Sequence, residues 1–280
     1  MIHSTAIINK QAKISKDVEI GAYSIVGENV SIDAGTCIKE RVFLENAQIG
    51  KDCKIFGGAI IGSIPQDLKF KEEKSYVEIG DKNTIREYVT INRGTTARGK
   101  TAIGNNNLIM AYSHIAHDCL IGDDVVIANA GTLAGHVDVE DKAVIGGLAA
   151  IHQFVCIGSL AIVGGCSKVV KDIPPYSLTD GHPARVYGLN SVGLKRAGFS
   201  DVLIAELKRV FKVLFFSSAP VKDSLEKFKK ENSPPSTILH LVKFIESSQR
   251  GITKGQLPRH PATSYPARKL GNWETGKLGN

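Results

Sequence analysis

The stretch IGNNNLIMAYSHIAHDCLIGDDVVIANAGTLAGHVDV, residues 103–139, decides the fold. An aliphatic residue returns at every sixth position through it, and the series continues to residue 169. Its members are Ile103, Ile109, Ile115, Ile121, Ile127, Leu133, Val139, Ile145, Ile151, Ile157, Val163 and Val169. A period of six is a multiple of the strand period of two, but not of the helical period of 3.6. A mostly small side chain follows each aliphatic residue by four positions, so each short strand should point one large and one small residue into a prism.

The same repeat runs through the N-terminal part of the chain, from Ile2 to Ile38. We predict that the frame then slips by one residue and continues at Phe43, followed by Ile49, Ile55, Ile61, Ile79, Ile85 and Ile91. Three faces make a coil of 18 residues, and coils stack about 4.8 Å apart. Glycine often follows the aliphatic residue, which suits a corner that needs unusual dihedrals or close backbone approach. Residues 63–76 and 92–101 break the repeat and are interpreted as projecting loops.

The repeat ends where Pro174 and Pro175 stop strand pairing. Downstream, Ser200 is a candidate N-cap for a helix that carries Leu203, Leu207, Val210, Phe211 and Leu214 on one face. Two further helices are predicted over 220–231 and 235–249. We therefore expect a mainly β chain, with a parallel β-helix over residues 1–183, a small α-helical C-terminal domain over 184–254, and a disordered tail over 255–280.

Composition narrows the cellular setting. The chain has 280 residues, 42% of them hydrophobic, and no apolar run approaches the roughly 20 residues of a membrane span. The N-terminus lacks the features of a signal peptide. The five cysteines include no CxxC pair, which favours reduced thiols over a disulfide framework. We expect a cytoplasmic protein with no integral membrane association.

The charge is unevenly distributed along the chain. Residues 1–183 carry 18 Lys and Arg against 21 Asp and Glu, whereas residues 184–280 carry 17 against 7. A basic C-terminal third suggests an anionic partner, with a merely solubilising surface as the alternative. Nucleic acid is disfavoured, because the basic residues have no interleaved aromatic residues and no known binding motif.

The segment SHIAHDC, residues 113–119, carries the strongest chemical signal. Its histidines could stack coils, bind a metal or act as a general base. His114 and His117 are three residues apart, which on a strand points them to different sides and disfavours a shared metal. One coil of 18 residues places Gly135 against His117 and His136 against Asp118. A histidine beside a glycine N–H offers the base and the oxyanion donor that acyl transfer needs.

The neighbours of His117 have weaker claims to a role. Asp118 could orient a neighbouring imidazole, although adjacent strand residues face opposite ways. Cys119 falls on the small inward position of its hexad, so packing explains it better than a nucleophilic role does.

The motifs PQDLK, SHIAHDC, LAGHV, GGLAAIHQF, VGGCS, PPYS and GLKRAGFS occur in this order. Together they resemble the UDP-N-acetylglucosamine O-acyltransferases, a family of hexapeptide-repeat transferases, from about residue 3 to 251. The resemblance implies a left-handed β-helix and a homotrimer with active sites between subunits. It also implies transfer of an (R)-3-hydroxyacyl group from acyl carrier protein to UDP-N-acetylglucosamine, the first step of lipid A biosynthesis, without a metal or other cofactor.

Roles carry over position by position. The resemblance makes His117, assisted by Asp118, the catalytic base and the Gly135 N–H the oxyanion donor. It assigns substrate-binding positions to Asp67, Lys69, His114, His136, His152, Gln153, Asn190 and Arg196, the last two near the uridine and phosphates. Gly165 matches the position that limits acyl length, where a small residue favours a longer chain; an ordinary corner glycine is the alternative.

Three departures from the family pattern leave parts of this interpretation open. Asn92 stands where the family has His, Val192 where it has Glu, and Ala197 where it has a second Arg. The nucleotide contacts are therefore less certain, and Asn92 leaves open whether the acceptor carries a hydroxyl or an amine at the sugar 3-position. The rival functions are the later N-acyltransferase of the pathway, a zinc-dependent hydratase with three His ligands, and a non-enzymatic scaffold.

Overall fold

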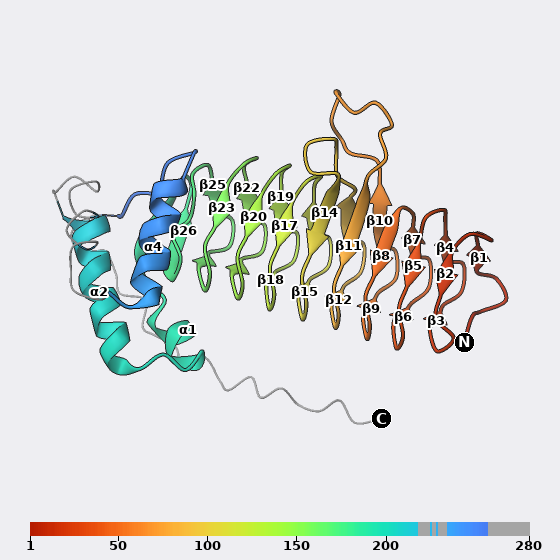
Figure 1. Ribbon diagram of the computed structural model, residues 1–280, viewed down its shortest axis with the longest axis horizontal. Helices are drawn as coiled ribbons and strands as arrows, with labels where there is room; N and C mark the ends of the chain where they lie inside the picture. The colour runs from red at the N-terminus through yellow and green to blue at the C-terminus, as the bar shows by residue number, and fades with distance from the viewer. Residues whose placement is uncertain (218–224, 226–227, 229–233, 257–280) are drawn as a thin grey trace.

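The computed structural model describes residues 1–217, 225, 228 and 234–256. The chain winds through three sheets in turn, and the strands up to β26 pair in parallel with their neighbours one coil away (Figure 1). Ile115 pairs with Leu133, Ile121 with Val139 and Ile127 with Ile145, which gives the predicted coil of 18 residues. The predicted left-handed parallel β-helix is confirmed.

The three sheets form the three faces of the prism. The first sheet contains β1 (Ile7–Ile8), β4 (Ile25–Val26), β7 (Phe43–Leu44), β10 (Ile60–Ser63), β13 (Thr90–Asn92), β16 (His114–Ile115), β19 (Thr132–Leu133), β22 (Ala150–Ile151) and β25 (Lys168–Val169). The second contains β2 (Lys13–Ile14), β5 (Ser31–Ile32), β8 (Ala47–Ile49), β11 (Tyr76–Ile79), β14 (Lys100–Ile103), β17 (Leu120–Ile121), β20 (Asp138–Val139) and β23 (Cys156–Ile157). The third contains β3 (Glu19–Ile20), β6 (Cys37–Ile38), β9 (Lys54–Ile55), β12 (Thr84–Ile85), β15 (Leu108–Ile109), β18 (Val126–Ile127), β21 (Val144–Ile145), β24 (Ile162–Val163), β26 (Ser177–Gly181) and β27 (Ala184–Leu189).

The core follows the predicted pairing of large and small residues. Ile115, Cys119 and Val125 are fully buried, and Ile121 exposes only 5% of its surface. The predicted frame slip is real, but it lies later than expected. Val26 pairs with Leu44, which keeps the 18-residue spacing, and Ile32 pairs with Ile49, which does not. Leu44, not Phe43, is therefore the inward residue, and the shortened corner is at residues 45–46.

Most of the glycines that follow the inward aliphatic residue are explained by close approach rather than by unusual dihedrals; Gly62, with φ of 89°, is an exception. A Cβ on Gly104 would lie 2.7 Å from the carbonyl oxygen of Gly122, while its own backbone needs no left-handed conformation. The left-handed residues come two positions later and are mostly not glycine. Among them are Asp118, with φ of 59°, and His136, with φ of 62°. This conformation determines the geometry of the site.

Two loops leave the prism at neighbouring coils (Figure 1), and both are slightly shorter than the expected 63–76 and 92–101. The first connects β10 to β11 and the second connects β13 to β14. They are bonded to each other: Arg93 N donates to Ser63 O at 3.0 Å, and the Arg93 guanidinium lies 5.2 Å from the centre of the Phe70 ring.

The C-terminal part packs on the end of the β-helix. Its first residues form β27, an antiparallel partner of β26, rather than part of a helix. The helices are α1 (Ser191–Arg196), α2 (Asp201–Phe216) and α4 (Ser236–Ser247). Ser200 caps α2 as predicted, accepting from Leu203 N at 3.2 Å. The predicted helix over 220–231 lies largely outside the described residues, and the predicted tail lies outside them from residue 257.

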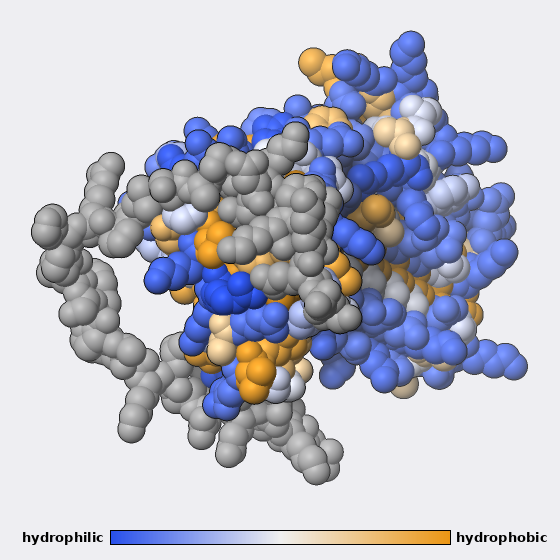
Figure 2. All heavy atoms as spheres, turned by 60° about the vertical axis from the view of Figure 1, so that its left-hand side comes forward, coloured by the Kyte–Doolittle hydropathy of each residue, from blue (hydrophilic) through white to orange (hydrophobic). Residues whose placement is uncertain are grey.

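A second apolar core joins these helices to the last coil, and one polar contact adds to it. The Tyr176 hydroxyl bonds to His240 Nδ1 at 2.7 Å, and His240 Nε2 lies 3.1 Å from Glu140. Figure 2 shows hydrophilic side chains over most of the β-helix in view and apolar side chains among the helices. Among the described residues, no helix combines the length and the hydropathy that crossing a membrane requires.

Candidate active site

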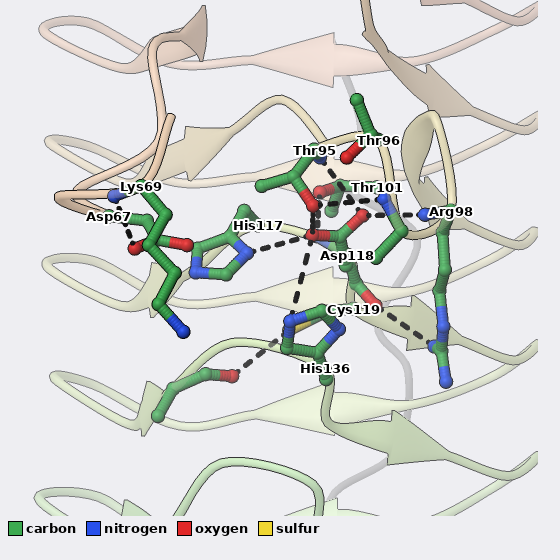
Figure 3. Close-up of polar contacts among 12 residues, drawn as sticks. Asp67, Lys69, Thr95, Thr96, Arg98, Thr101, His117, Asp118, Cys119 and His136 are labelled. Carbon is green, nitrogen blue, oxygen red and sulfur yellow. Dashed lines mark hydrogen bonds and ion pairs between the residues drawn. The ribbon is translucent and has the colours of Figure 1, made fainter. Parts of the chain in front are cut away.

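His117 and Asp118 lie at the corner between the first and second sheets, directly after β16. The left-handed backbone at Asp118 turns its carboxylate back toward the preceding side chain, so the strand rule of opposite faces does not apply there. His117 Nδ1 lies 2.8 Å from Asp118 Oδ2 (Figure 3). The two adjacent residues therefore form a hydrogen-bonded pair, although the alternation of side chains along a strand would have placed them on opposite faces.

The Asp118 carboxylate is fully buried and heavily bonded. Thr95 donates to it twice, from its backbone N at 2.9 Å and from its hydroxyl at 2.7 Å. Burial alone would raise the pKa of Asp118, but the hydrogen bonds from His117 and Thr95 outweigh it and lower the pKa below the ordinary value. Asp118 is therefore a carboxylate near neutral pH, and it can only accept from His117 Nδ1.

This fixes the roles of the two imidazole nitrogens. Because Nδ1 donates to Asp118, the lone pair of neutral His117 is on Nε2. A Cβ on Gly135 would lie only 2.7 Å from Nε2, so the ring lies directly against the Gly135 backbone. Within the part of the chain that the structure describes, the Gly135 N–H has no hydrogen-bond acceptor. The predicted stacking of His117 on Gly135 is thus present, and a free N–H accompanies it.

Further predicted residues continue along the same corner. His136 takes the place of Asp118 one coil on, with its ring 5.0 Å from that of His117 and stacked 4.5 Å from that of Phe154. Burial lowers the pKa of His136, opposed by the Asp118 charge. The following coil places His152 and Gln153 at this corner, both exposed.

His114 is nearby but is held by a different partner. Its Nδ1 bonds to the Thr90 hydroxyl at 2.7 Å across neighbouring coils. Burial lowers the pKa of His114, and the nearby His117 adds to this effect. His114 is thus favoured in its neutral form, as a hydrogen-bonding rather than a charged group.

The first loop brings Asp67 and Lys69 to the His117 side of the corner (Figure 3). Asp67 Oδ1 accepts from Lys69 N at 3.0 Å, and the Asp67 charge is close enough to raise the pKa of His136 slightly against the burial effect. Asn92 is buried where the second loop begins, and its Nδ2 donates to Ile64 O at 3.0 Å. Its Oδ1 is also buried but has no described partner.

Three predicted substrate residues do not join His117 within one chain. Gly165 is at a different corner, between the third and first sheets, where a Cβ would meet only Gly147 O at 3.3 Å. Asn190 caps α1, accepting from Gly193 N at 2.9 Å and donating to Leu160 O at 2.8 Å. Arg196 is exposed in the last turn of α1.

Two other chemistries can be weighed at this corner. His117, Asp118 and His136 offer three possible metal-ligand atoms within 4.8 Å of one another. Asp118 Oδ2 already accepts from His117 and Thr95, so hydrogen bonds account for the cluster without an ion. Cys119 is fully buried, which raises its thiol pKa to about 12 and disfavours the thiolate that a nucleophile requires.

Comparison with known proteins identifies the family to which the chain belongs. Residues 172–253 match the family described as UDP-N-acetylglucosamine O-acyltransferase, domain 2, and residues 100–134 match the bacterial transferase hexapeptide repeat. Residues 2–101 match the GMPPB C-terminal domain. An acyl-[acyl-carrier-protein]–UDP-N-acetylglucosamine O-acyltransferase from Thermodesulfovibrio yellowstonii is 52% identical over 90% of this chain and 99% of its own. The chain belongs to the UDP-N-acetylglucosamine O-acyltransferase family.

Solved structures of the family agree with this assignment. The acyltransferase from Bacteroides fragilis superposes with a TM-score of 0.89 at 41% identity, covering 91% of this chain and 100% of that one. The Arabidopsis acyltransferase gives a TM-score of 0.81 at 33% identity, covering 91% and 100%. Members of this family are acyltransferases, so the fold and the enzyme class predicted from the sequence are both confirmed.

Sequence reasoning missed Thr95, Thr101 and Phe154. Phe154 is 18 residues after His136, so the coil length could have found it. Thr101 accepts from Asp118 N at 2.9 Å, but the irregular spacing before it hides this relation. Thr95 is in an insertion outside the repeat, and no periodic signal marks it.

Proposed function

We propose that this protein transfers an (R)-3-hydroxyacyl group from acyl carrier protein to the 3-position of UDP-N-acetylglucosamine, as the first step of lipid A biosynthesis. The observation that carries the proposal is the orientation of His117. Buried, ionised Asp118 holds Nδ1 at 2.8 Å, which leaves Nε2 as a base against the Gly135 backbone. The relatives named for this reaction support the choice of substrates.

The geometry suggests the following chemistry. His117 Nε2 takes the proton of the sugar 3-hydroxyl as that oxygen attacks the thioester carbonyl carbon. The Gly135 N–H donates to the oxyanion that forms, and Asp118 stabilises the imidazolium. When the intermediate collapses, the C–S bond breaks and the imidazolium returns its proton to the departing thiolate. General-base catalysis contributes about 10² to 10⁴ in rate, and an oxyanion donor about 10² to 10³.

A homotrimer would complete the site. Gly165, Asn190 and Arg196 lie away from His117 in one chain, so a neighbouring subunit would have to supply them. The outward residues of the third sheet support such packing, because five of its strands carry half-buried or exposed apolar side chains on the outer face. These are Leu108, Val126, Val144, Ile162 and Leu178. We propose a cytoplasmic location, where acyl carrier protein would be available.

The test is an acyl-transfer assay with purified protein, a series of 3-hydroxyacyl carrier proteins, and two acceptors. One acceptor is UDP-N-acetylglucosamine and the other is its 3-amino analogue. We expect ester formation to dominate. A strong preference for the amine would instead support the second candidate function, acyl transfer to the 3-amino sugar, which Asn92 leaves open because it replaces the family's His. Transfer to neither acceptor would refute the proposal.

A further inference from the structure

The second loop reaches past the candidate site and is held at its far end by Arg98. The Arg98 guanidinium forms a two-pronged ion pair with Asp138 of β20, with NH2 3.0 Å from Oδ2. NH1 also donates to Asp118 O at 2.9 Å. Arg98 therefore joins a loop to two successive coils of the β-helix; Figure 3 shows its bond to the Asp118 backbone.

The same loop surrounds the Asp118 carboxylate. Oδ1 accepts from the backbone N of Thr95 at 2.9 Å and of Arg98 at 3.2 Å, and Oδ2 accepts from the Thr95 hydroxyl at 2.7 Å. The fourth donor is His117. Three of the four hydrogen bonds that orient this carboxylate thus come from the loop.

Thr95 is buried, but the part of the loop that follows it has little packing of its own. Residues 96–98 are exposed, and Gly99, with φ of 70°, has no atom within 4 Å of where a Cβ would stand. Both ends of the loop are tied to Tyr76, the first residue of β11: Gly94 N donates to Tyr76 O at 3.3 Å, and Tyr76 N donates to Gly99 O at 3.1 Å. Between these ties, the Arg98 side chain adds the contacts that join the exposed residues 96–98 to Asp138 and to the Asp118 backbone.

We propose that Arg98 is a positioning residue, which fixes the Asp118 carboxylate, and through it the His117 imidazole, by clamping this loop to Asp138. The inference rests on the proposed role of His117. Arg98 touches no reacting atom in this scheme, so its removal should lower kcat without weakening donor binding. The pairing is geometrically demanding, because a planar guanidinium matches a carboxylate with two parallel bonds, which Lys cannot reproduce.

The experiment compares Arg98→Met and Asp138→Asn with Lys100→Met. The control residue Lys100 is two residues after Arg98, and its ammonium group lies 2.6 Å from Glu78. Lys100→Met removes this ion pair, which does not involve Asp118. A misplacement of about 1 Å at a reacting group can cost about 10² in rate. We expect kcat to fall about 10-fold for both clamp variants with an unchanged KM for donor, while Lys100→Met keeps wild-type kcat. Arg98→Lys should recover part of the loss.

A double-mutant cycle separates positioning from general destabilisation. If Arg98 acts through Asp118, adding Arg98→Met to Asp118→Asn should cost no further activity. Full multiplication of the two losses, or a kcat for Arg98→Met equal to that of Lys100→Met, would overturn the inference. His117→Ala is run alongside. An active His117→Ala refutes the proposed function, whereas an inactive one with normal Arg98→Met refutes only the clamp.

Discussion

Gly135→Ala is the sharpest perturbation of the site, because it adds one carbon atom where His117 already lies. The new Cβ would stand 2.7 Å from both Cε1 and Nε2 of the imidazole. Ordinary contact begins at 3.4 Å, so the ring would have to move by about 0.7 Å. The backbone of Gly135 does not require a positive φ, so alanine is otherwise allowed there.

Gly135→Ala should affect kcat more than stability. A shift of this size would strain the 2.8 Å bond between His117 and Asp118 and misplace the base relative to the Gly135 N–H. We expect kcat to fall by about 10- to 100-fold, in line with the cost of misplacing a catalytic group by about 1 Å. Stability should fall by no more than about 2–3 kcal/mol, because overpacking costs about 1–3 kcal/mol while replacing glycine recovers about 0.4–1 kcal/mol from the unfolded chain.

The assay is acyl transfer at saturating substrates together with thermal unfolding. Gly57→Ala is the matched control. Gly57 occupies the same place in its hexad, but at a different corner two coils before His117. Its Cβ would meet the flexible Glu40 side chain at 3.0 Å and Glu40 O at 3.2 Å. We expect this control to keep wild-type kcat. A Gly135→Ala enzyme with kcat within about twofold of wild type would refute the placement of His117 against Gly135.

The remaining predictions use other parts of the site. Ionised Asp118 should stabilise the fold above its unfolded pKa of about 3.9, and this contribution is lost as pH falls toward the lowered folded pKa. The difference in Tm between wild type and Asp118→Asn should thus be largest near pH 7 and shrink below pH about 3.9; a constant difference would contradict this. Cys119→Ala should retain kcat, because a thiol with a pKa of about 12 is not a thiolate at neutral pH. An inactive but folded Cys119→Ala variant would instead support a nucleophilic role for this residue. Lys208→Glu and Lys212→Glu reverse exposed charges on α2 and should raise KM for the acidic carrier-linked donor, most strongly at low salt. An unchanged KM would mean that α2 does not bind the carrier protein as the anionic partner suggested by the charge distribution.

The repeat made the β-helix predictable because every sixth residue points into one narrow core. The coil length of 18 also predicted the contact between His117 and Gly135, which come together only because successive coils stack. The position of the frame slip was wrong by one hexad, since both Phe43 and Leu44 are apolar and the sequence offers no reason to choose between them. Pairing with Val26 decides it.

The loops set the limit of prediction from sequence. The bond between His117 and Asp118 depends on the left-handed backbone of Asp118 at the corner. An aspartate in the sequence does not by itself predict that conformation. Thr95 and Arg98 lie in an insertion, so their contacts with Asp118 follow from how the loop folds back and not from any period. Gly165, Asn190 and Arg196 could not be placed relative to His117 by one chain's repeat, because they lie elsewhere on the prism and its C-terminal cap.

The central claim is that His117 is the general base of acyl transfer. The most direct test is the single-turnover rate of His117→Ala with carrier-bound 3-hydroxyacyl donor and UDP-N-acetylglucosamine, measured beside its thermal unfolding. We predict a fall of about 10² to 10⁴ in rate, with a Tm close to that of wild type. A folded His117→Ala enzyme that turns over at nearly the wild-type rate would contradict the account.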